Sequence, residues 1–183
     1  TKIDSRKFHF VANATAAIQL ALKALDIEDG DIITTPFTYM ATTSAILWER
    51  CRPVYVDIDP KTYCIDASKI EKALTPNTRA ILAVHVFGNP CDVEQIDAIA
   101  KKYNLKVIYD AAHAFGAVYE NRSLLNYGDI STCSFHATKL FHTIEGGAVI
   151  CKNQSVSDKV NLLKRFGHLG DTHYTLGINA KSS

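Results

Sequence analysis

The sequence predicts an α/β fold built around a largely parallel sheet, and two observations lead to this class. Short β-rich runs alternate with amphipathic helical runs, as they do where crossover helices join parallel strands. Of the 183 residues, 47% are hydrophobic and 21% are charged, which is close to the globular average and argues against disorder. A chain of this length can bury a sizeable core, and we find no internal repeat or linker. We therefore expect one domain over residues 1–183.

The first half of the chain is expected to contain three helices and two strands. Asn13 offers helix-capping chemistry before an Ala- and Leu-rich stretch, and Asp66 does the same further along. Pro36 stops a short strand that follows the turn at Gly30. The expected elements are a helix over 13–25, a strand over 32–35, a helix over 39–50, a strand over 54–59 and a helix over 66–74.

The second half is expected to continue the alternation around four further strands. Asp92 caps a helix in which apolar residues recur at helical spacing, and the strand after it closes on the acidic residue Asp110. Two more strand candidates flank the loop that carries Lys139. The expected elements are strands over 79–86, 106–110, 130–135 and 148–151, a helix over 92–103, a polar helix beyond Val156 and a mobile loop over 166–170.

Charge and cysteine content exclude several classes of function. Lys and Arg total 20 against 19 Asp and Glu, and no like-charged run occurs, so we expect no nucleic-acid partner. No apolar run approaches the length of a membrane span, and no signal peptide opens the chain, so we expect no membrane association. The five cysteines form neither a CxxC pair nor a Cys/His cluster. We interpret them as idle thiols in a reducing cytoplasm, with no metal site.

Asp110 is the first of three candidate chemical features. It follows a hydrophobic strand, and ligands of open parallel sheets bind beyond the carboxyl ends of the strands. An acid there can pair with a cationic ring nitrogen or a metal, or it can simply cap the next helix. The small residues Ala111 and Ala112 leave room for a flat ligand, which favours the binding interpretation.

Lys139 and the residues around Asn13 are the other two features. A lysine between two strands, flanked by His136 and His142, can become an amine nucleophile through partial desolvation, although most lysines are solvated surface residues. The segment 13–16 places backbone N–H groups and a hydroxyl at a helix start, which suits phosphate as well as plain capping. Together the three features offer a phosphate site, an acid for a ring nitrogen and a lysine for an imine, which is the set that pyridoxal 5′-phosphate (PLP) requires.

Six segments of the chain resemble, in order, the motifs of the DegT-type nucleotide-sugar aminotransferases. These are fold-type I PLP enzymes with the aspartate aminotransferase fold. The resemblance extends over nearly the whole chain from about Phe10, and its SFHATK and EGG segments are highly specific. It implies a three-layer α/β/α PLP-transferase large domain with a central, mostly parallel sheet. The six segments are residues 13–17, 35–42, 54–59, 110–114, 134–139 and 145–149.

The resemblance implies a role for each candidate site residue. Lys139 would hold PLP through an imine and later carry a proton, and Asp110 would pair with the pyridinium nitrogen. Tyr39 would stack on one face of the ring, although a core aromatic is the alternative. His113 stands where most relatives have a glutamine that contacts the ring oxygen, and His85, His136 and His142 are taken as structural. The residues expected to bind the phosphate are Thr15, Ala16 and Ser134.

The resemblance also bears on assembly and completeness. The tail over 177–183 resembles a loop that reaches into the neighbouring subunit, where Asn179 would contact the phosphate, so a homodimer with shared sites is expected. Family members are about twice as long. We therefore expect the chain to be a fragment that lacks a small C-terminal domain and part of the N-terminus.

The implied reaction is transfer of an amino group from an amino acid, L-glutamate, to a nucleotide-linked 4-keto-6-deoxy sugar. Its product would feed lipopolysaccharide O-antigen or another surface glycan, and amination at position 3 of the sugar stays open. Lys139 favours transamination over the chemistry of dehydratase relatives, which have histidine there. The competing hypothesis is a folded remnant that dimerises or binds PLP without turnover. A Cys/His metal protein is disfavoured because no ligand spacing supports it.

Overall fold

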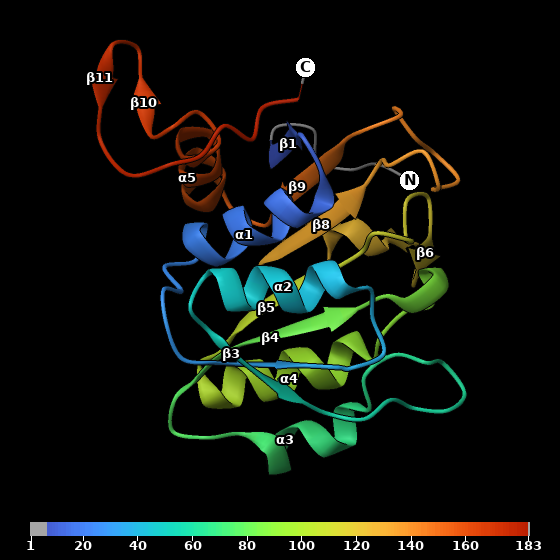
Figure 1. The fold of residues 1–183 in the computed structure, drawn as a ribbon. Coiled ribbons are helices and arrows are strands. Elements are labelled where there is room, and N and C mark those ends of the chain that lie inside the picture. Colours follow the sequence, from blue (N-terminus) through green and yellow to red (C-terminus); the bar gives the residue numbers. More distant parts are fainter. Residues whose placement is uncertain (1–6, 183) are drawn as a thin grey trace.

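A seven-stranded mixed sheet forms the centre of the molecule in the computed structural model, which describes residues 7–182 (Figure 1). The strand order is β1-β9-β8-β5-β4-β2-β3. The run from β8 to β3 is parallel throughout, while β9 is antiparallel to both β8 and β1. The strands are β1 (Phe8–Val11), β2 (Asp31–Thr34), β3 (Arg52–Tyr55), β4 (Thr78–Val84), β5 (Lys106–Asp110), β8 (Ile130–Ser134) and β9 (Gly147–Cys151).

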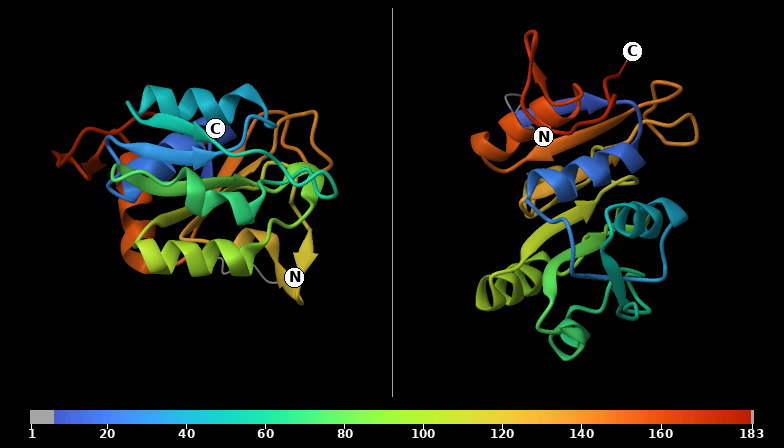
Figure 2. Two further views of the ribbon diagram at one scale, coloured as in Figure 1. Left: turned by 90° about the horizontal axis from the view of Figure 1, so that it is seen from below. Right: turned by 60° about the vertical axis from the view of Figure 1, so that its left-hand side comes forward.

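Helices cover both faces of this sheet and make three layers, as Figure 2 shows from below. One face packs against α1, α2 and α5, and the other against α3 and α4. The α-helices are α1 (Ala14–Ala24), α2 (Met40–Trp48), α3 (Ile70–Ala73), α4 (Val93–Tyr103) and α5 (Gln154–Leu163). The 3-10 helices are η2 (Ala67–Lys69), η3 (Val86–Gly88) and η4 (Leu124–Asn126), and two small hairpins pair β6 (Val118–Tyr119) with β7 (Arg122–Ser123) and β10 (His168–Leu169) with β11 (Thr172–His173).

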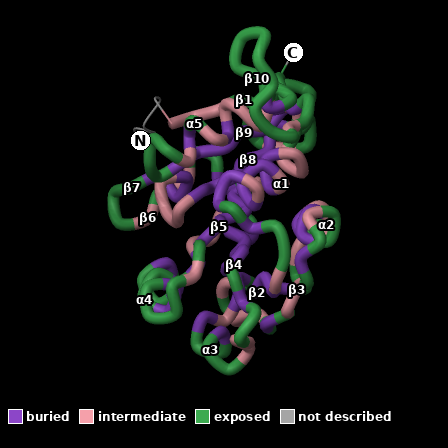
Figure 3. The backbone as a smooth tube through the Cα atoms, turned by 90° about the vertical axis from the view of Figure 1, so that its left-hand side faces the viewer, coloured by how far each residue is buried: buried purple, intermediate pink, exposed green. Residues whose placement is uncertain are grey.

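Alternate residues of the buried strands serve the two faces. Ile32 and Leu82 pack under α1 and α2, while their neighbours Ile33 and Ile81 pack under α3 and α4. Burying both faces requires strands that are apolar throughout, which is why β4 lacks polar alternation. The buried residues run along the sheet and the inner sides of the helices (Figure 3). The three-layer α/β class that the sequence predicts is confirmed.

Several predicted boundaries are wrong for local reasons. The strand expected over 54–59 is β3, which ends at Tyr55, because Asp57 turns the chain by accepting from the Ile58 N–H at 2.8 Å. The helix expected over 66–74 is split into η2 and α3. The loop expected over 166–170 contains β10, which forms a hairpin with β11. Within residues 7–182, no helix combines the length and the apolar character needed to cross a membrane.

A buried carboxylate holds the amino ends of β2 and β3 together. Asp31 is 3% exposed and accepts two hydrogen bonds from Arg52, at 2.8 Å from Nε and 2.6 Å from Nη2. The Thr75 hydroxyl donates to the same carboxylate at 2.5 Å. These bonds to the charged form lower the pKa of Asp31 to about 2.

We expect Asp31→Asn to lower the unfolding free energy at neutral pH by about 1–2 kcal/mol, because Arg52 is largely exposed and its contribution is screened by solvent. The contribution of Asp31 is complete above the ordinary carboxyl pKa and is lost as pH falls towards 2. Urea unfolding from pH 7 down to pH 2 should therefore show a loss in the wild type that the variant lacks. Equal pH slopes would contradict this assignment.

Candidate functional site

A cavity of about 630 Å³ opens at the carboxyl ends of the parallel strands. Loops after β2, β4, β5 and β8 meet there with the start of α1. This is the position where open parallel sheets bind ligands. The predicted site residues that line it are Thr15, Tyr39, Asp110, His113, Ser134 and Lys139.

Lys139 lies on a tight turn in the loop between β8 and β9. Its N–H donates to the His136 carbonyl at 2.9 Å, which closes the turn. The His136 ring adds a contact between Nδ1 and the Thr138 hydroxyl at 2.9 Å, and its Nε2 lies 3.5 Å from Oε1 of Glu145. His136 therefore links the lysine turn to the other end of the same loop. His136 was predicted to be structural, and the structure places it on the cavity wall as well.

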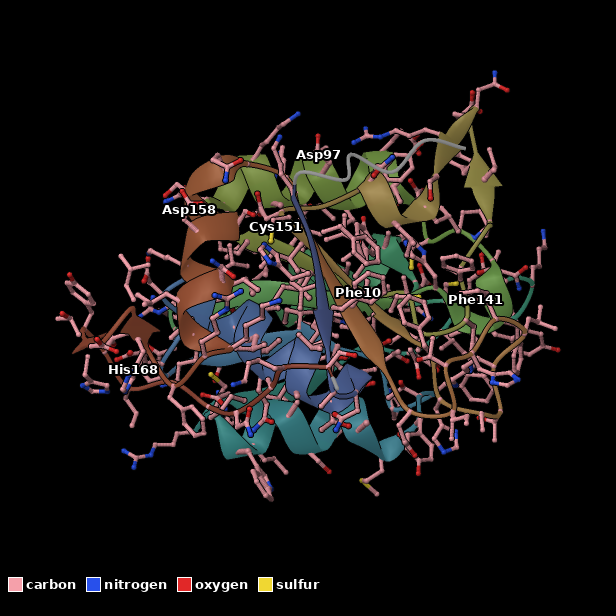
Figure 4. The ribbon with its side chains drawn as sticks, turned by 90° about the horizontal axis from the view of Figure 1, so that it is seen from above. Phe10, Asp97, Phe141, Cys151, Asp158 and His168 are labelled. Carbon is pink, nitrogen blue, oxygen red and sulfur yellow. The ribbon has the colours of Figure 1, made fainter. Side chains whose placement is uncertain are left out.

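Stacked aromatic rings hold the far side of this loop. Phe141 stacks on Phe115, with ring centroids 4.5 Å apart, and meets Phe135 edge-on at 5.4 Å. Figure 4 shows Phe141 at the opposite end of the molecule from His168 on the β10–β11 hairpin. The lysine loop is thus packed against the body of the domain, while the side chain of Leu140 beside Lys139 is fully exposed.

Asp110 ends β5 with its carboxylate buried against the cavity. Oδ2 accepts from the Thr42 hydroxyl at 2.7 Å, and Oδ1 accepts from the Ala112 N–H at 3.1 Å. Burial raises the pKa of Asp110 above its ordinary value, while these hydrogen bonds and the charge of Lys139 oppose that rise. A carboxylate in this setting is stabilised by a cationic partner in the cavity.

The start of α1 lies beside Ser134 because Gly147 permits a close approach. Ser134 and Gly147 are paired across β8 and β9. A Cβ built on Gly147 would lie 2.8 Å from the Ala14 nitrogen and 2.6 Å from the carbonyl carbon of Asn13. Any larger residue would therefore separate the helix start from the sheet. The first-turn N–H groups that the Asn13 cap does not use, together with the Ser134 hydroxyl, make this corner suitable for an anion.

Tyr39 and His113 also line the cavity. Tyr39 precedes α2 and is 83% exposed, so it is not a core aromatic. His113 follows Asp110 by one turn, and its ring stacks on that of Phe87. Partial burial and the charge of Lys139 lower the pKa of His113, so the neutral imidazole is favoured.

Two predicted residues do not line the cavity. The Ala16 N–H donates to the Asn13 side chain at 2.8 Å, which is the capping bond of α1. Asn179 is exposed on the tail, where it pairs with Arg165 in an isolated antiparallel bridge. Their contacts with phosphate stay predictions.

The other two histidines that were taken as structural lie outside the cavity lining. His85 is fully buried, its Nδ1 accepts from the Cys91 N–H at 3.1 Å, and burial lowers its pKa to about 4. The ring of His142 accepts from the Ile144 N–H at 3.4 Å. All five cysteines are buried and unpaired.

The sequence reasoning missed several residues that shape the cavity. Thr42 ends the quoted segment over 35–42, but its contact with Asp110, 68 positions away, could not be seen in that segment. Thr42 also shares a 2.8 Å hydrogen bond with the hydroxyl of Thr38, which lines the cavity. Glu145 stood in the quoted EGG segment and could have been singled out as an acid near Lys139. Phe87 lies just beyond the strand expected over 79–86 and was not singled out.

The family model for DegT/DnrJ/EryC1/StrS aminotransferases matches residues 5–181. The chain belongs to this family. The family and the fold that the sequence predicts are therefore confirmed. Relatives in this family are sugar transaminases.

Two relatives illustrate the match within this aminotransferase family. The dTDP-4-amino-4,6-dideoxy-D-glucose transaminase of Shigella dysenteriae is 49% identical over 93% of this chain and 47% of its own length. The GDP-perosamine synthase of Escherichia coli O157:H7 is 41% identical over 92% of this chain and 48% of its own length. The chain thus spans about half the length of the curated relatives it matches.

Solved structures agree with the same family. DesI, solved in the presence of its TDP-sugar product, superposes with a TM-score of 0.90 at 35% identity, over 96% of this chain and 45% of its own. NtdA from Bacillus subtilis, solved with bound cofactor PMP, superposes with a TM-score of 0.89 at 35% identity, over 96% of this chain and 41% of its own.

We expect Gly147→Ala to lower the unfolding free energy by about 1–3 kcal/mol, because the added methyl meets backbone atoms of Asn13 and Ala14 that cannot move independently. Gly146→Ala is the comparison, since its closest neighbour would be a side-chain atom, the Thr143 hydroxyl, which can rotate away at the loss of its hydrogen bond to the Glu145 carbonyl. Denaturant titration of the two variants measures the difference. An equal loss would show that the close approach of α1 is not the constraint.

We expect Thr42→Val to raise the pKa of Asp110 further, because a hydroxyl that donates to the charged carboxylate is lost at nearly constant volume. Carbon-13 NMR titration of the aspartate carboxyl groups measures this shift. Thr43→Val on the same helix is the control, because Thr43 contacts Tyr55 instead. An unchanged Asp110 titration would show that the hydroxyl does not stabilise the charged form.

Proposed function

We propose that this chain is the cofactor-binding part of a PLP-dependent aminotransferase that acts on a nucleotide-linked sugar. The observation that carries the proposal is one cavity lined by Lys139, by the buried carboxylate of Asp110 and by the start of α1 beside Ser134. A primary amine, an anion site and a buried acid are the groups that PLP requires.

The residues of the cavity fit this cofactor. Burial raises the pKa of Asp110, and a protonated ring nitrogen in the cavity would pair with its carboxylate and favour the charged form. The approach that Gly147 permits leaves the first N–H groups of α1 beside Ser134, which suits a phosphate. Bound PLP would supply an electron sink for the substrate carbon.

Each residue then has a definite task in the proposal. Lys139 anchors the cofactor through its Nζ and carries the proton that moves at the substrate carbon. Asp110 keeps the ring nitrogen protonated, Tyr39 covers one face of the ring and His113 donates to the ring oxygen. The phosphate is held by Thr15, Ala16 and Ser134, with Asn179 reaching the site of the partner in a homodimer.

The substrates follow from the relatives. A dTDP-4-amino-4,6-dideoxy-D-glucose transaminase and a GDP-perosamine synthase are both among them, which supports a nucleotide-linked 4-keto-6-deoxy sugar as acceptor. As donor we propose an amino acid, L-glutamate. A relative described as a spore coat polysaccharide biosynthesis protein supports a role in surface glycans such as O-antigen. The unpaired cysteines support a cytoplasmic setting.

The test is borohydride trapping of PLP on the chain, followed by intact mass and peptide mapping. We expect one adduct, located on Lys139, because the turn and the charges around it place that amine alone in the cavity among the described lysines. Lys139→Arg should abolish the adduct and all amination of keto sugars, and the exposed Lys61→Arg should change neither. An adduct that persists in Lys139→Arg would contradict the proposal.

The same experiment separates the competing function. A specific adduct on Lys139 without any amination of 4-keto-6-deoxy sugars in the presence of glutamate would favour a chain that folds and binds PLP without turnover. Measurable amination by the chain would exclude that alternative.

A further inference from the structure

Phe87 has a backbone conformation that a bulky residue rarely adopts. It follows β4 in η3 with a φ of 55°, and Gly88 after it has a φ of 84°. The Phe87 side chain is 66% exposed, so burial of its ring does not explain the conformation. Backbone strain of this kind persists where neighbouring contacts enforce it, and it concentrates at functional sites.

His113 is one of the residues that this conformation contacts. The Phe87 ring also meets those of Phe37 and Tyr63, with centroids 6.4 and 6.3 Å away, and the Gly88 N–H donates to the His85 carbonyl at 3.1 Å. The Phe87 N–H donates to Nδ1 of His113 at 3.4 Å. The two rings are parallel, with an interplanar angle of 5° and centroids 6.0 Å apart. A Cβ on Gly88 would lie 3.1 Å from the His113 carbonyl oxygen, so glycine lets the loop approach His113 this closely.

An N–H that donates to Nδ1 determines where the imidazole carries its own proton. In neutral histidine one ring nitrogen accepts and the other donates, and the bond made by one fixes the role of the other. Since Nδ1 accepts from Phe87, the hydrogen is on Nε2. The charged groups that affect this ring are Asp110 and Lys139, and both line the same cavity.

We propose that Phe87 is a positioning residue, whose backbone N–H holds His113 as the Nε2–H tautomer so that His113 donates to an acceptor oxygen of the ligand in the cavity. If the ligand is PLP, the acceptor is its ring oxygen, and this part of the inference rests on the proposed function. Because the Phe87 N–H occupies Nδ1, the Nε2–H group is the donor that His113 offers to the cavity.

The tautomer can be measured without any cofactor. Nitrogen-15 NMR of histidine-labelled protein separates the two neutral tautomers, and loss of a signal in His113→Gln assigns the residue. We expect unprotonated Nδ1 in the wild type and in Phe87→Gly, which keeps the N–H and adopts positive φ freely. Phe87→Pro removes the donor and should give a mixture of tautomers.

A second variant keeps the test decisive if Phe87→Pro fails to fold. Gly88→Ala strains the left-handed residue and places a methyl against the His113 carbonyl, so it should also shift the tautomer ratio while the donor is retained. A wild-type His113 protonated on Nδ1, or a ratio that neither variant changes, would overturn the proposal.

PLP affinity, measured by absorbance, tests whether His113 donates to the bound cofactor. We expect His113→Gln to bind within about threefold of the wild type and His113→Leu about tenfold more weakly, because only the first retains a donor. Phe87→Gly should resemble the wild type, and Phe87→Pro should resemble His113→Leu. Equal affinity of all four variants would contradict the donor role. If no variant binds PLP, the proposed function fails, and the NMR result still decides whether Phe87 fixes the tautomer.

Discussion

The close contact between Gly147 and the first residues of α1 is the constraint on which the cavity depends. β9 is antiparallel between β8 and β1, so its first residue lies beside Ser134 on one side and Val11 on the other. Because Gly147 has no side chain, the chain can leave β1 and begin α1 directly over this point. A helix start, with its unpaired N–H groups, is thereby fixed within the same corner as the end of β8.

The second requirement is electrostatic, and it links two layers of the domain. The hydroxyl of Thr42 on α2 reaches the carboxylate of Asp110 in the sheet and offsets part of the cost of burying it. The remaining cost is visible in the raised pKa of Asp110. A cationic ligand beside Asp110 stabilises the charged carboxylate and offsets this cost. The buried acid therefore favours binding of a cationic ligand independently of any bond to Lys139.

Capping residues and apolar periodicity in the sequence correctly predict the helices and strands whose bounds they determine. The helix expected over 92–103 is α4, because Asp92 caps it and apolar residues recur on one face. The strand expected over 106–110 coincides with β5. The strand expected over 54–59 ends early, at Tyr55, where the Asp57 carboxylate accepts from the Ile58 N–H. Hydrophobicity does not reveal such competition between a side chain and the sheet for backbone groups.

The candidate site shows the same division between local and long-range information. Lys139, Asp110 and the segment at Asn13 stand in recognisable motifs, and the structure brings all three to one cavity. Thr42 and Phe87 act through partners 68 and 26 positions away, so their contacts arise only when the strands are assembled. Alternation and capping carry no information about such pairs, which depend on the register of the sheet.

The cavity wall is chemically asymmetric, and this asymmetry separates two kinds of function. On the side of β8 and β5 the lining is polar, and the carboxylate of Asp110 is held by hydrogen bonds from Thr42 and Ala112 at 2.7 and 3.1 Å. On the side of β4 and β2 it is aromatic, and Phe87 and Tyr39 are more than half exposed. Buried, fully bonded groups tolerate few replacements, whereas exposed rings can change at little cost to stability. The polar side therefore constrains the chemistry that the cavity can support, and the aromatic side can be replaced at less cost to the fold.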